Sequence, residues 1–419
     1  MGPIVLFDKS FIEMLNVDEA ALFDFLFLTN ICPMFMTEVL ADLEKERPGE
    51  RTREKIVADL ARKTPAAHSY PNLLHASICL TELHGRPIEM DRRPVLPGGR
   101  PVRHERKLGM YYEESAEMKA YSRWQDGRFL EVERDYARYW RAQLMSADLA
   151  QIAALARAVL SIRSDPKNLE EALDIAKAAV LGEQNRYRVF KAAYAFLGIP
   201  TAQWPKVLSI WKAAGGPPLA KHAPYTAHCL LVDMLFHVAV AKKLISPGRL
   251  SNRIDIAYLY YLPFAMAFVS NDKLHKRVVP LLLRDDQLFI DGEELKRDLQ
   301  ALDIHYSGLP KEQLEQGLFH FAKPPDDDRF LTTRIYRRFG ARVDHGIVLA
   351  PEQNKKVSTE VLGMVKAMAA EAKKPTSNVS WQEAEDADHI SIERKLSAQR
   401  GKWRIMSAEN EARATKQGD

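Results

Sequence analysis

The chain has 419 residues, of which 46% are hydrophobic and 28% charged, a composition that supports about two to three domains with buried cores. It excludes a disulfide-stapled miniprotein and a wholly disordered chain. The 60 Lys and Arg residues exceed the 56 Asp and Glu residues by only four, so the net charge alone does not require nucleic acid. Three dispersed cysteines and no apolar stretch of bilayer length predict a soluble, cytoplasmic protein with no membrane partner.

The first 44 residues alternate short apolar runs with helix-forming segments. Ile4–Phe7 predicts a buried strand that stops at Asp8, and an apolar-periodic helix follows it. Ile31–Phe35 is a second short apolar run, and Thr37–Glu44 contains good helix formers. This alternation predicts the start of an α/β domain, residues 1–44.

Residues 45–220 predict a mainly α-helical insertion. Between Gly85 and Gly109 six residues disfavour regular structure, which predicts a loop; they are Pro87, Pro94, Pro97, Gly98, Gly99 and Pro101. Helical patterns then cover the segments Tyr111–Ala158, Leu169–Leu181 and Tyr187–Phe196.

The α/β pattern resumes over residues 221–300. Ala227–Leu244 and Arg253–Leu262 predict apolar helices, and Ala265–Val269 predicts a buried strand. Residues 301–419 are predicted to be a C-terminal extension, with a polar tail from Lys373 that is flexible or weakly helical.

Four acidic residues stand beside predicted strand ends or helix starts. Asp8 and Asp272 follow strands, while Glu38 and Asp255 lie in the first turns of helices. In parallel α/β sheets, ligands bind at the carboxyl ends of the strands, so these acids can converge there. Converging carboxylates repel one another and favour Mg²⁺ or Mn²⁺, ions that serve phosphodiester hydrolysis. We predict a catalytic metal site of Asp8, Glu38, Asp255 and Asp272, in which Asp233 could replace or join Asp255.

Three segments resemble the motifs of PIN-domain nucleases. Val5–Ser10 resembles their first strand, an apolar run that ends in Asp with a Ser or Thr two residues later. Cys32–Leu43 is similar to their second motif, in which Glu38 opens a helix. Asp255–Asp272 resembles their closing unit of helix, strand, Ser or Thr, and Asp. The resemblance covers roughly residues 1–44 and 225–300.

This resemblance implies an α/β fold, a PIN-like parallel sheet flanked by helices and interrupted by the helical insertion. It also implies a metal-dependent endoribonuclease, in which Mg²⁺ or Mn²⁺ activates a water against single-stranded RNA. Ser10, Ser270 and Asn271 would orient the metal ligands or the water. His275 is expected at the surface, and Asp42 and Glu44 on a solvated helix face.

The segment from Arg86 to Lys107 is locally basic, with seven basic residues against three acidic ones. Arginines of this kind contact phosphates of single-stranded nucleic acid. The alternative is that they pair with nearby glutamates. The predicted RNA contacts are Arg92, Arg93, Arg100, Arg103, Arg106 and Lys107.

Two other functions remain open from the sequence. A non-catalytic PIN-like scaffold would use the insertion or the tail to recruit a protein partner or a second copy of the chain. An aspartyl-nucleophile phosphatase would have a second Asp two residues after Asp8, where this chain has Ser10, and is therefore less favoured.

Overall fold

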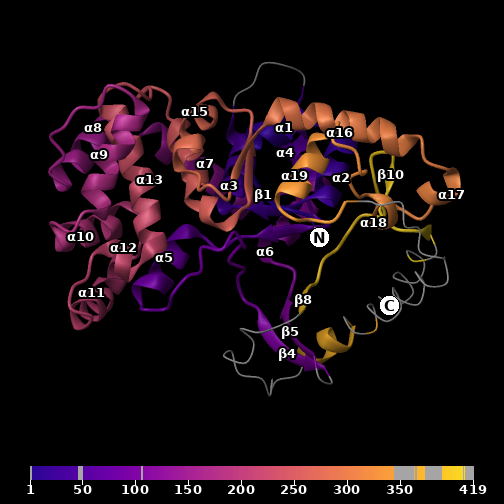
Figure 1. The fold of residues 1–419 in the computed structure, drawn as a ribbon, viewed down its shortest axis with the longest axis horizontal. Coiled ribbons are helices and arrows are strands. Elements are labelled where there is room, and N and C mark those ends of the chain that lie inside the picture. The colour runs from indigo at the N-terminus through magenta and orange to yellow at the C-terminus, as the bar shows by residue number, and fades with distance from the viewer. Residues whose placement is uncertain are drawn as a thin grey trace.

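The computed structural model describes residues 2–45, 51–104, 107–343, 363, 366–372, 389–408 and 410. A parallel sheet with flanking helices forms the centre of the molecule, and a helical lobe extends from one side of it (Figure 1). A small three-stranded sheet projects away from the central sheet (Figure 1). The α/β class predicted from the sequence is confirmed at this level.

The central sheet has five parallel strands in the order β3-β2-β1-β6-β7. They are β1 (Ile4–Phe7), β2 (Leu28–Ile31), β3 (Ser69–Pro71), β6 (Ala267–Ser270) and β7 (Leu288–Asp291). From β1 the chain moves outward to β2 and β3, and it later returns to place β6 on the other side of β1. The strand order therefore reverses between β1 and β6, which is where open α/β sheets bind ligands at their carboxyl edge.

Strands β1 and β6 are buried at every position, as expected for parallel strands covered on both faces. Phe7 of β1 packs edge-on against Phe23 and Phe35, with ring centroids 5.8 and 5.0 Å away. These contacts join β1 to the helices α2 (Val17–Leu26) and α3 (Pro33–Ala41). The core is thus built around the strand that carries Asp8 at its end.

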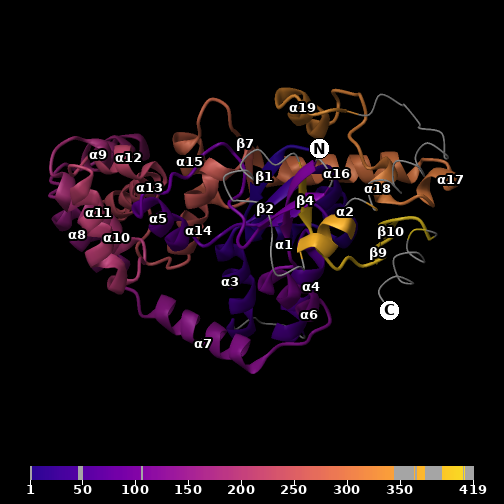
Figure 2. The ribbon, with the colours of Figure 1, turned by 90° about the horizontal axis from the view of Figure 1, so that it is seen from below.

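Further helices surround the sheet (Figure 2). α16 packs on both α2 and α19, while α3 packs on α7 and α4 packs on α6. Their bounds, with those of the neighbouring short helices, are α1 (Lys9–Met14), η1 (Asp42–Glu44), α4 (Arg53–Lys63), α6 (Ala116–Gln125), α7 (Glu131–Met145), α14 (Asn252–Ala257), η3 (Tyr258–Phe264), α15 (Lys273–Leu282), α16 (Gly292–Ser307) and α19 (Leu331–Arg338).

The helical lobe forms around α13 (Pro224–Ala241), which is buried along almost its entire length. This helix is long and apolar enough to cross a membrane, but 83% of it lies inside the protein, where it contacts its neighbours in the lobe. The other elements of this region are α5 (His75–Leu83), α8 (Leu149–Val159), α9 (Leu169–Leu181), α10 (Arg186–Phe196), η2 (Thr201–Gln203), α11 (Trp204–Ala213) and α12 (Leu219–His222).

Several predicted boundaries differ from the structure. Strand β3 lies inside the range predicted as the insertion, so the boundary at residue 45 is too early; Pro71 fits there because β3 is an edge strand. The predicted loop between Gly85 and Gly109 contains β4 (Arg100–His104), which pairs with β5 (Lys107–Tyr112). The predicted helix Tyr111–Ala158 is instead the end of β5 followed by three separate helices.

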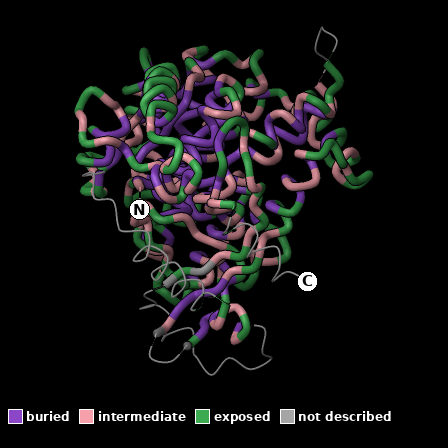
Figure 3. The backbone as a smooth tube through the Cα atoms, turned by 90° about the vertical axis from the view of Figure 1, so that its right-hand side faces the viewer, coloured by how far each residue is buried: buried purple, intermediate pink, exposed green. Residues whose placement is uncertain are grey.

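Part of the C-terminal extension packs against the N-terminal domain. β8 (His389–Ile392) pairs with β5, and the hairpin of β9 (Gln399–Arg400) and β10 (Trp403–Arg404) lies beside α2. Arg400 pairs with the buried Asp24 of α2 at 2.8 Å. The short helices α17 (Lys311–Leu314) and α18 (Leu318–Phe321) precede these strands. The tail predicted from Lys373 thus contains three short strands between residues 389 and 404, whereas residues 373–388 lie outside the described residues. Figure 3 shows where buried and exposed residues alternate along the chain.

Candidate functional site

Asp8 joins the ends of β1 and β6. It caps α1 by accepting a hydrogen bond from Phe11 N at 3.1 Å. Its Oδ2 accepts hydrogen bonds from Ser270 Oγ at 2.7 Å and Ser10 Oγ at 2.8 Å. His275 Nδ1 lies 3.1 Å from the same oxygen. Two of the predicted supporting residues, Ser10 and Ser270, therefore contact the first predicted metal ligand directly.

His275 of α15 is fully buried, so the expectation of a surface position is wrong. Its Nδ1 faces the Asp8 carboxylate, and its Nε2 lies 2.7 Å from the backbone oxygen of Asp255. Burial lowers the pKa of His275, but the hydrogen bond and charge of Asp8, with the charge of Asp255, outweigh it and raise the pKa to about 9. With an acceptor at each ring nitrogen, the ring is an imidazolium that fixes Asp8 and the backbone at Asp255.

Asp272 and Asp255 share one cationic neighbour. Asp272 caps α15 through a hydrogen bond from Leu274 N to Oδ1 at 2.6 Å, which leaves Oδ2 facing Arg249 at 3.0 Å. The same Arg249 nitrogen lies 3.8 Å from Asp255 Oδ2. The arginine side chain is 54% exposed, and its single guanidinium spans both carboxylates.

Asp255 is the least satisfied acid of the group. Its side chain is nearly buried, and Oδ2 has no hydrogen-bond partner among the described residues. Burial is the main cause that raises the pKa of Asp255 to about 7; the charges of Asp272 and Glu38 add to it, while His275 and Arg249 oppose it. The charges of Asp272 and Glu38 thus act on Asp255, and we refer to these residues together with Asp8 as the acid cluster.

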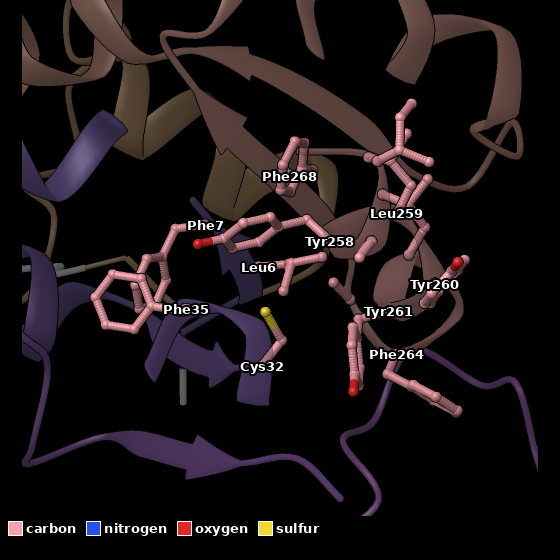
Figure 4. Packing of buried hydrophobic residues seen from close by; sticks show 14 of the residues in the cluster. Leu6, Phe7, Cys32, Phe35, Tyr258, Leu259, Tyr260, Tyr261, Phe264 and Phe268 are labelled. Carbon is pink, nitrogen blue, oxygen red and sulfur yellow. The ribbon is translucent and has the colours of Figure 1, made fainter. Parts of the chain in front are cut away.

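Glu38 reaches the cluster from α3. Tyr258 donates a hydrogen bond from its hydroxyl to Glu38 Oε2 at 2.7 Å. The Tyr258 ring lies among the core residues Phe7, Leu6 and Phe268 (Figure 4). Burial raises the pKa of Glu38, with a further contribution from the charge of Asp8, although the Lys9 charge and the Tyr258 hydrogen bond act in the opposite direction.

Lys9 and Asp42 were missed by the sequence analysis. The buried Lys9 ammonium lies 2.7 Å from Asp42 and 3.9 Å from Glu38. Asp42 is only 3% exposed, so its expected place on a solvated helix face is wrong; Glu44 is partly exposed beside Arg53. The position of Lys9 between Asp8 and Ser10 could have indicated that it pairs with an acid of the site. The sequence alone does not identify Asp42 and Glu38 as its partners, because they come close to Lys9 only when the chain folds.

Asp233 does not join the four acids. It lies in the helical lobe, where Arg253 pairs with it at 3.0 Å and the Tyr260 hydroxyl donates to it. Asn271 also forms no hydrogen bond with the four carboxylates in the described part of the chain. Its backbone N–H donates to Ser10 Oγ at 3.1 Å, and its side chain contacts Lys276 and Glu293.

The side chains of this site fit the ligand requirements of Mg²⁺ or Mn²⁺ only in part. Within the described residues there is no group of three or more His, Cys, Asp or Glu side chains placed as a preformed metal site. Hydroxyls and the cations Lys9, Arg249 and His275 occupy much of the carboxylate surface. The donor type still fits Mg²⁺ or Mn²⁺, because Asp255 offers an oxygen without a hydrogen bond from any described residue and its neighbour Arg249 has a half-exposed side chain.

The basic segment is largely paired with acids. Arg92 lies 3.5 Å from Asp286, which precedes β7 and so marks the amino edge of the sheet, opposite Asp8. Arg93 pairs with Asp91, and Arg100 lies 3.4 Å from Glu113. Arg103 is exposed on β4, Arg106 lies outside the described residues, and only the backbone of Lys107 is described. Exposed ion pairs of this kind contribute little to the free energy of folding, so the arginines can exchange their carboxylate partners for phosphates.

Comparison with known proteins returns no significant match to a family model, a curated protein or a solved structure. The functional argument therefore depends on the geometry of the carboxyl edge.

Proposed function

We propose that this protein is a PIN-like, metal-dependent endonuclease that cleaves single-stranded RNA. The observation that supports it best is the group of buried and half-buried acids at the carboxyl edge, where the strand order reverses, with Asp255 Oδ2 left without a hydrogen bond from any described residue. A buried carboxylate without a complete set of donors costs stability, and such costs are typical of functional sites.

In this proposal Asp8, Glu38, Asp255 and Asp272 hold Mg²⁺ or Mn²⁺. The bound ion would supply the positive charge that activates water and stabilises the leaving oxygen. Ser10 and Ser270 fix the orientation of Asp8 through the hydrogen bonds described above. His275 is a positioning residue, because it binds Asp8 through one nitrogen and the backbone at Asp255 through the other.

Arg249 has a separate role in the proposal. In the structure it neutralises Asp272 and Asp255, and in the complex it exchanges these carboxylates for a phosphate of the RNA. The basic segment supplies further backbone contacts away from the cleavage point. The helical insertion and the C-terminal extension offer surfaces for a protein partner or a second copy of the chain.

The test is cleavage of a labelled single-stranded RNA in Mn²⁺ by the Asp255→Asn variant. The amide keeps the side-chain volume and removes the charge, so the cleavage rate should fall at least about a hundredfold. Mutating even a residue that only hydrogen-bonds to a metal ligand typically lowers metal affinity or activity about ten- to hundredfold. Asp255 is preferable to Asp8, whose carboxylate also caps α1 and anchors His275.

A matched control is Asp286→Asn, which removes a carboxylate at the opposite edge of the sheet. Its rate should equal that of the unmodified protein. If Asp255→Asn retains full activity, or if the unmodified protein does not cleave RNA, the scaffold function becomes the better description. A parallel reaction on DNA of the same sequence measures the preference for RNA.

A further inference from the structure

A cavity of about 320 Å³ lies where the C-terminal segment closes over the connection between α4 and β3. Its walls come from the end of α2, residues 62–67, α6 and residues 394–405. Phe25 precedes β2 and Ala66 precedes β3, so the cavity is at the amino edge of these strands. It is therefore separate from the acid cluster, which lies at the carboxyl edge.

Arg394 is the distinctive residue of this cavity. Its Nη1 donates to Ser69 Oγ at 2.6 Å and to the backbone oxygen of Ala66, and its guanidinium lies over the Tyr70 ring. Neither Nε nor Nη2 of Arg394 makes a hydrogen bond or an ion pair with any described residue. Nη1 is therefore anchored, while the edge formed by Nε and Nη2 is free of described partners. An edge of this kind can bind a carboxylate or phosphate through two parallel hydrogen bonds.

The acids around the cavity already have other partners. Asp24 accepts hydrogen bonds from the backbone of Ala66 at 2.7 Å and of Ala67 at 2.9 Å, and it pairs with Arg400. Asp126 and Glu114 also line the cavity; Asp126 pairs with Arg128, and Glu114 accepts from the backbone of Lys395. Among the described residues, Arg394 forms no ion pair with these carboxylates, and neither does Lys395, another cation of the lining.

One part of the lining is suited to an apolar group. Phe25, Met118 and Tyr121 contribute buried side chains to the walls, and Leu396 and Ile405 approach from the C-terminal segment. The Tyr121 hydroxyl is buried near Thr64 and has no hydrogen-bond partner among the described residues. The cavity therefore combines many polar and charged groups with an apolar patch, so it can accept a ligand that has both a polar and an apolar part.

We propose that this cavity binds a small organic anion, whose oxyanion pairs with Nε and Nη2 of Arg394 and whose apolar part packs against Phe25, Met118 and Tyr121. The anionic group is a phosphate or a carboxylate, since both match the free guanidinium edge. Because residues 394–405 form one wall, the ligand also fastens the C-terminal segment to the N-terminal domain. This site does not depend on the proposed nuclease activity.

The test is calorimetric titration of the full chain with phenyl phosphate, which combines an oxyanion with an aromatic ring. Saturable binding is expected, and Arg394→Gln should weaken it at least tenfold. The control Arg329→Gln removes an exposed arginine elsewhere on the molecule and should leave the affinity unchanged. Inorganic phosphate should bind more weakly than phenyl phosphate, because it lacks the apolar part.

Phenylacetate distinguishes the two anion classes. Tighter binding of phenyl phosphate supports a phosphate ligand, and tighter binding of phenylacetate supports a carboxylate. The proposal is overturned if neither compound binds saturably at concentrations of about 10 mM, well above a Kd of 1 mM. Equal binding by Arg394→Gln would also overturn it.

A second measurement protects the test against misfolding of the variant, because Arg394 also holds Ala66 and Ser69. Phenylglyoxal modifies arginine side chains, and mass spectrometry of the unmodified chain locates each adduct. Phenyl phosphate should protect Arg394 and leave the modification of Arg329 unchanged. Equal modification of Arg394 with and without phenyl phosphate would overturn the proposal.

Discussion

Buried carboxylates occur in both the helical lobe and the carboxyl edge of the sheet, but they are satisfied to different extents. In the lobe, Asp233 is paired with Arg253 and Tyr260, and Glu82 accepts hydrogen bonds from the backbone of Tyr225 and Thr226 at the start of α13. At the edge, Asp255 retains an oxygen without a hydrogen-bond partner. Complete satisfaction indicates a structural role, whereas incomplete satisfaction beside other acids indicates a place for a cation.

Buried histidines show the same contrast. Burial lowers the pKa of His75, His228 and His237 to about 4, so the lobe holds them neutral at physiological pH. His275 at the sheet edge has a pKa raised to about 9 by Asp8 and Asp255, which more than offset the effect of burial. The lobe therefore keeps its buried histidines neutral, while the sheet edge favours a charged one.

Removing the Asp233 charge should have the largest effect on stability. Asp233→Asn leaves the Arg253 guanidinium without its carboxylate, and breaking a buried pair costs about 3 to 5 kcal/mol. Urea denaturation should show this loss in the free energy of unfolding. Asp135→Asn is a matched control, because Asp135 forms an exposed pair with Arg138 and should change stability by less than about 0.5 kcal/mol. A small loss for Asp233→Asn would show that its network is dispensable.

The corresponding substitution at the sheet edge, Asp255→Asn, should increase the free energy of unfolding instead of decreasing it. Without metal, Asp255→Asn should stabilise the protein by about 1 to 3 kcal/mol, because it removes a buried charge that lacks a hydrogen-bond partner. Mn²⁺ should raise the melting temperature of the unmodified protein and have little effect on this variant. A variant that is less stable without metal, or equally stabilised by Mn²⁺, would place Asp255 among the structural acids.

The sequence was sufficient to place the two strands that end in acids. The apolar runs before Asp8 and Asp272 are short, rich in strand formers and limited by helix-capping residues, so local physics determines both elements. Strand β3 was missed because three residues that include Pro71 carry too little local signal. It forms a strand through its pairing with β2, which is a tertiary effect.

Partners within the site were harder to predict than the acids themselves. The sequence brings Asp8, Glu38, Asp255 and Asp272 to one edge by topology, but it does not show that Lys9 pairs with Asp42 or that His275 lies between Asp8 and Asp255. These contacts join residues far apart in the chain, and a buried side chain acquires its partner only when the elements pack. For the same reason Asp233, on an apolar helix, was a plausible ligand until Arg253 was seen beside it.

The neutral histidines of the lobe should make stability decrease in acid. Their folded-state pKa values lie near 4, below the usual value of 6.5, so the unfolded state binds more protons as the pH falls from 6.5 to about 4. Each histidine should therefore lower stability by about 1 kcal/mol per pH unit within this window and have no effect above it. His228→Gln should reduce the slope of stability against pH, and His305→Gln, at an exposed position, should not. An unchanged slope for His228→Gln would mean that its ring is charged in the folded protein.

The smallest expected effect concerns Arg249, whose single charge would bind RNA at the edge. Arg249→Gln should weaken binding of single-stranded RNA in EDTA, where no cleavage occurs, and should make the slope of log K against log salt shallower by about 0.7, the value for one lost phosphate contact. Arg329→Gln is the control, because Arg329 is an exposed arginine outside both the acid site and the basic segment. If RNA enters at the carboxyl edge, Arg249→Gln changes the slope and Arg329→Gln does not. A change for Arg92→Gln alone would place the RNA on the basic segment and away from the four acids, which separates binding from the proposed cleavage site.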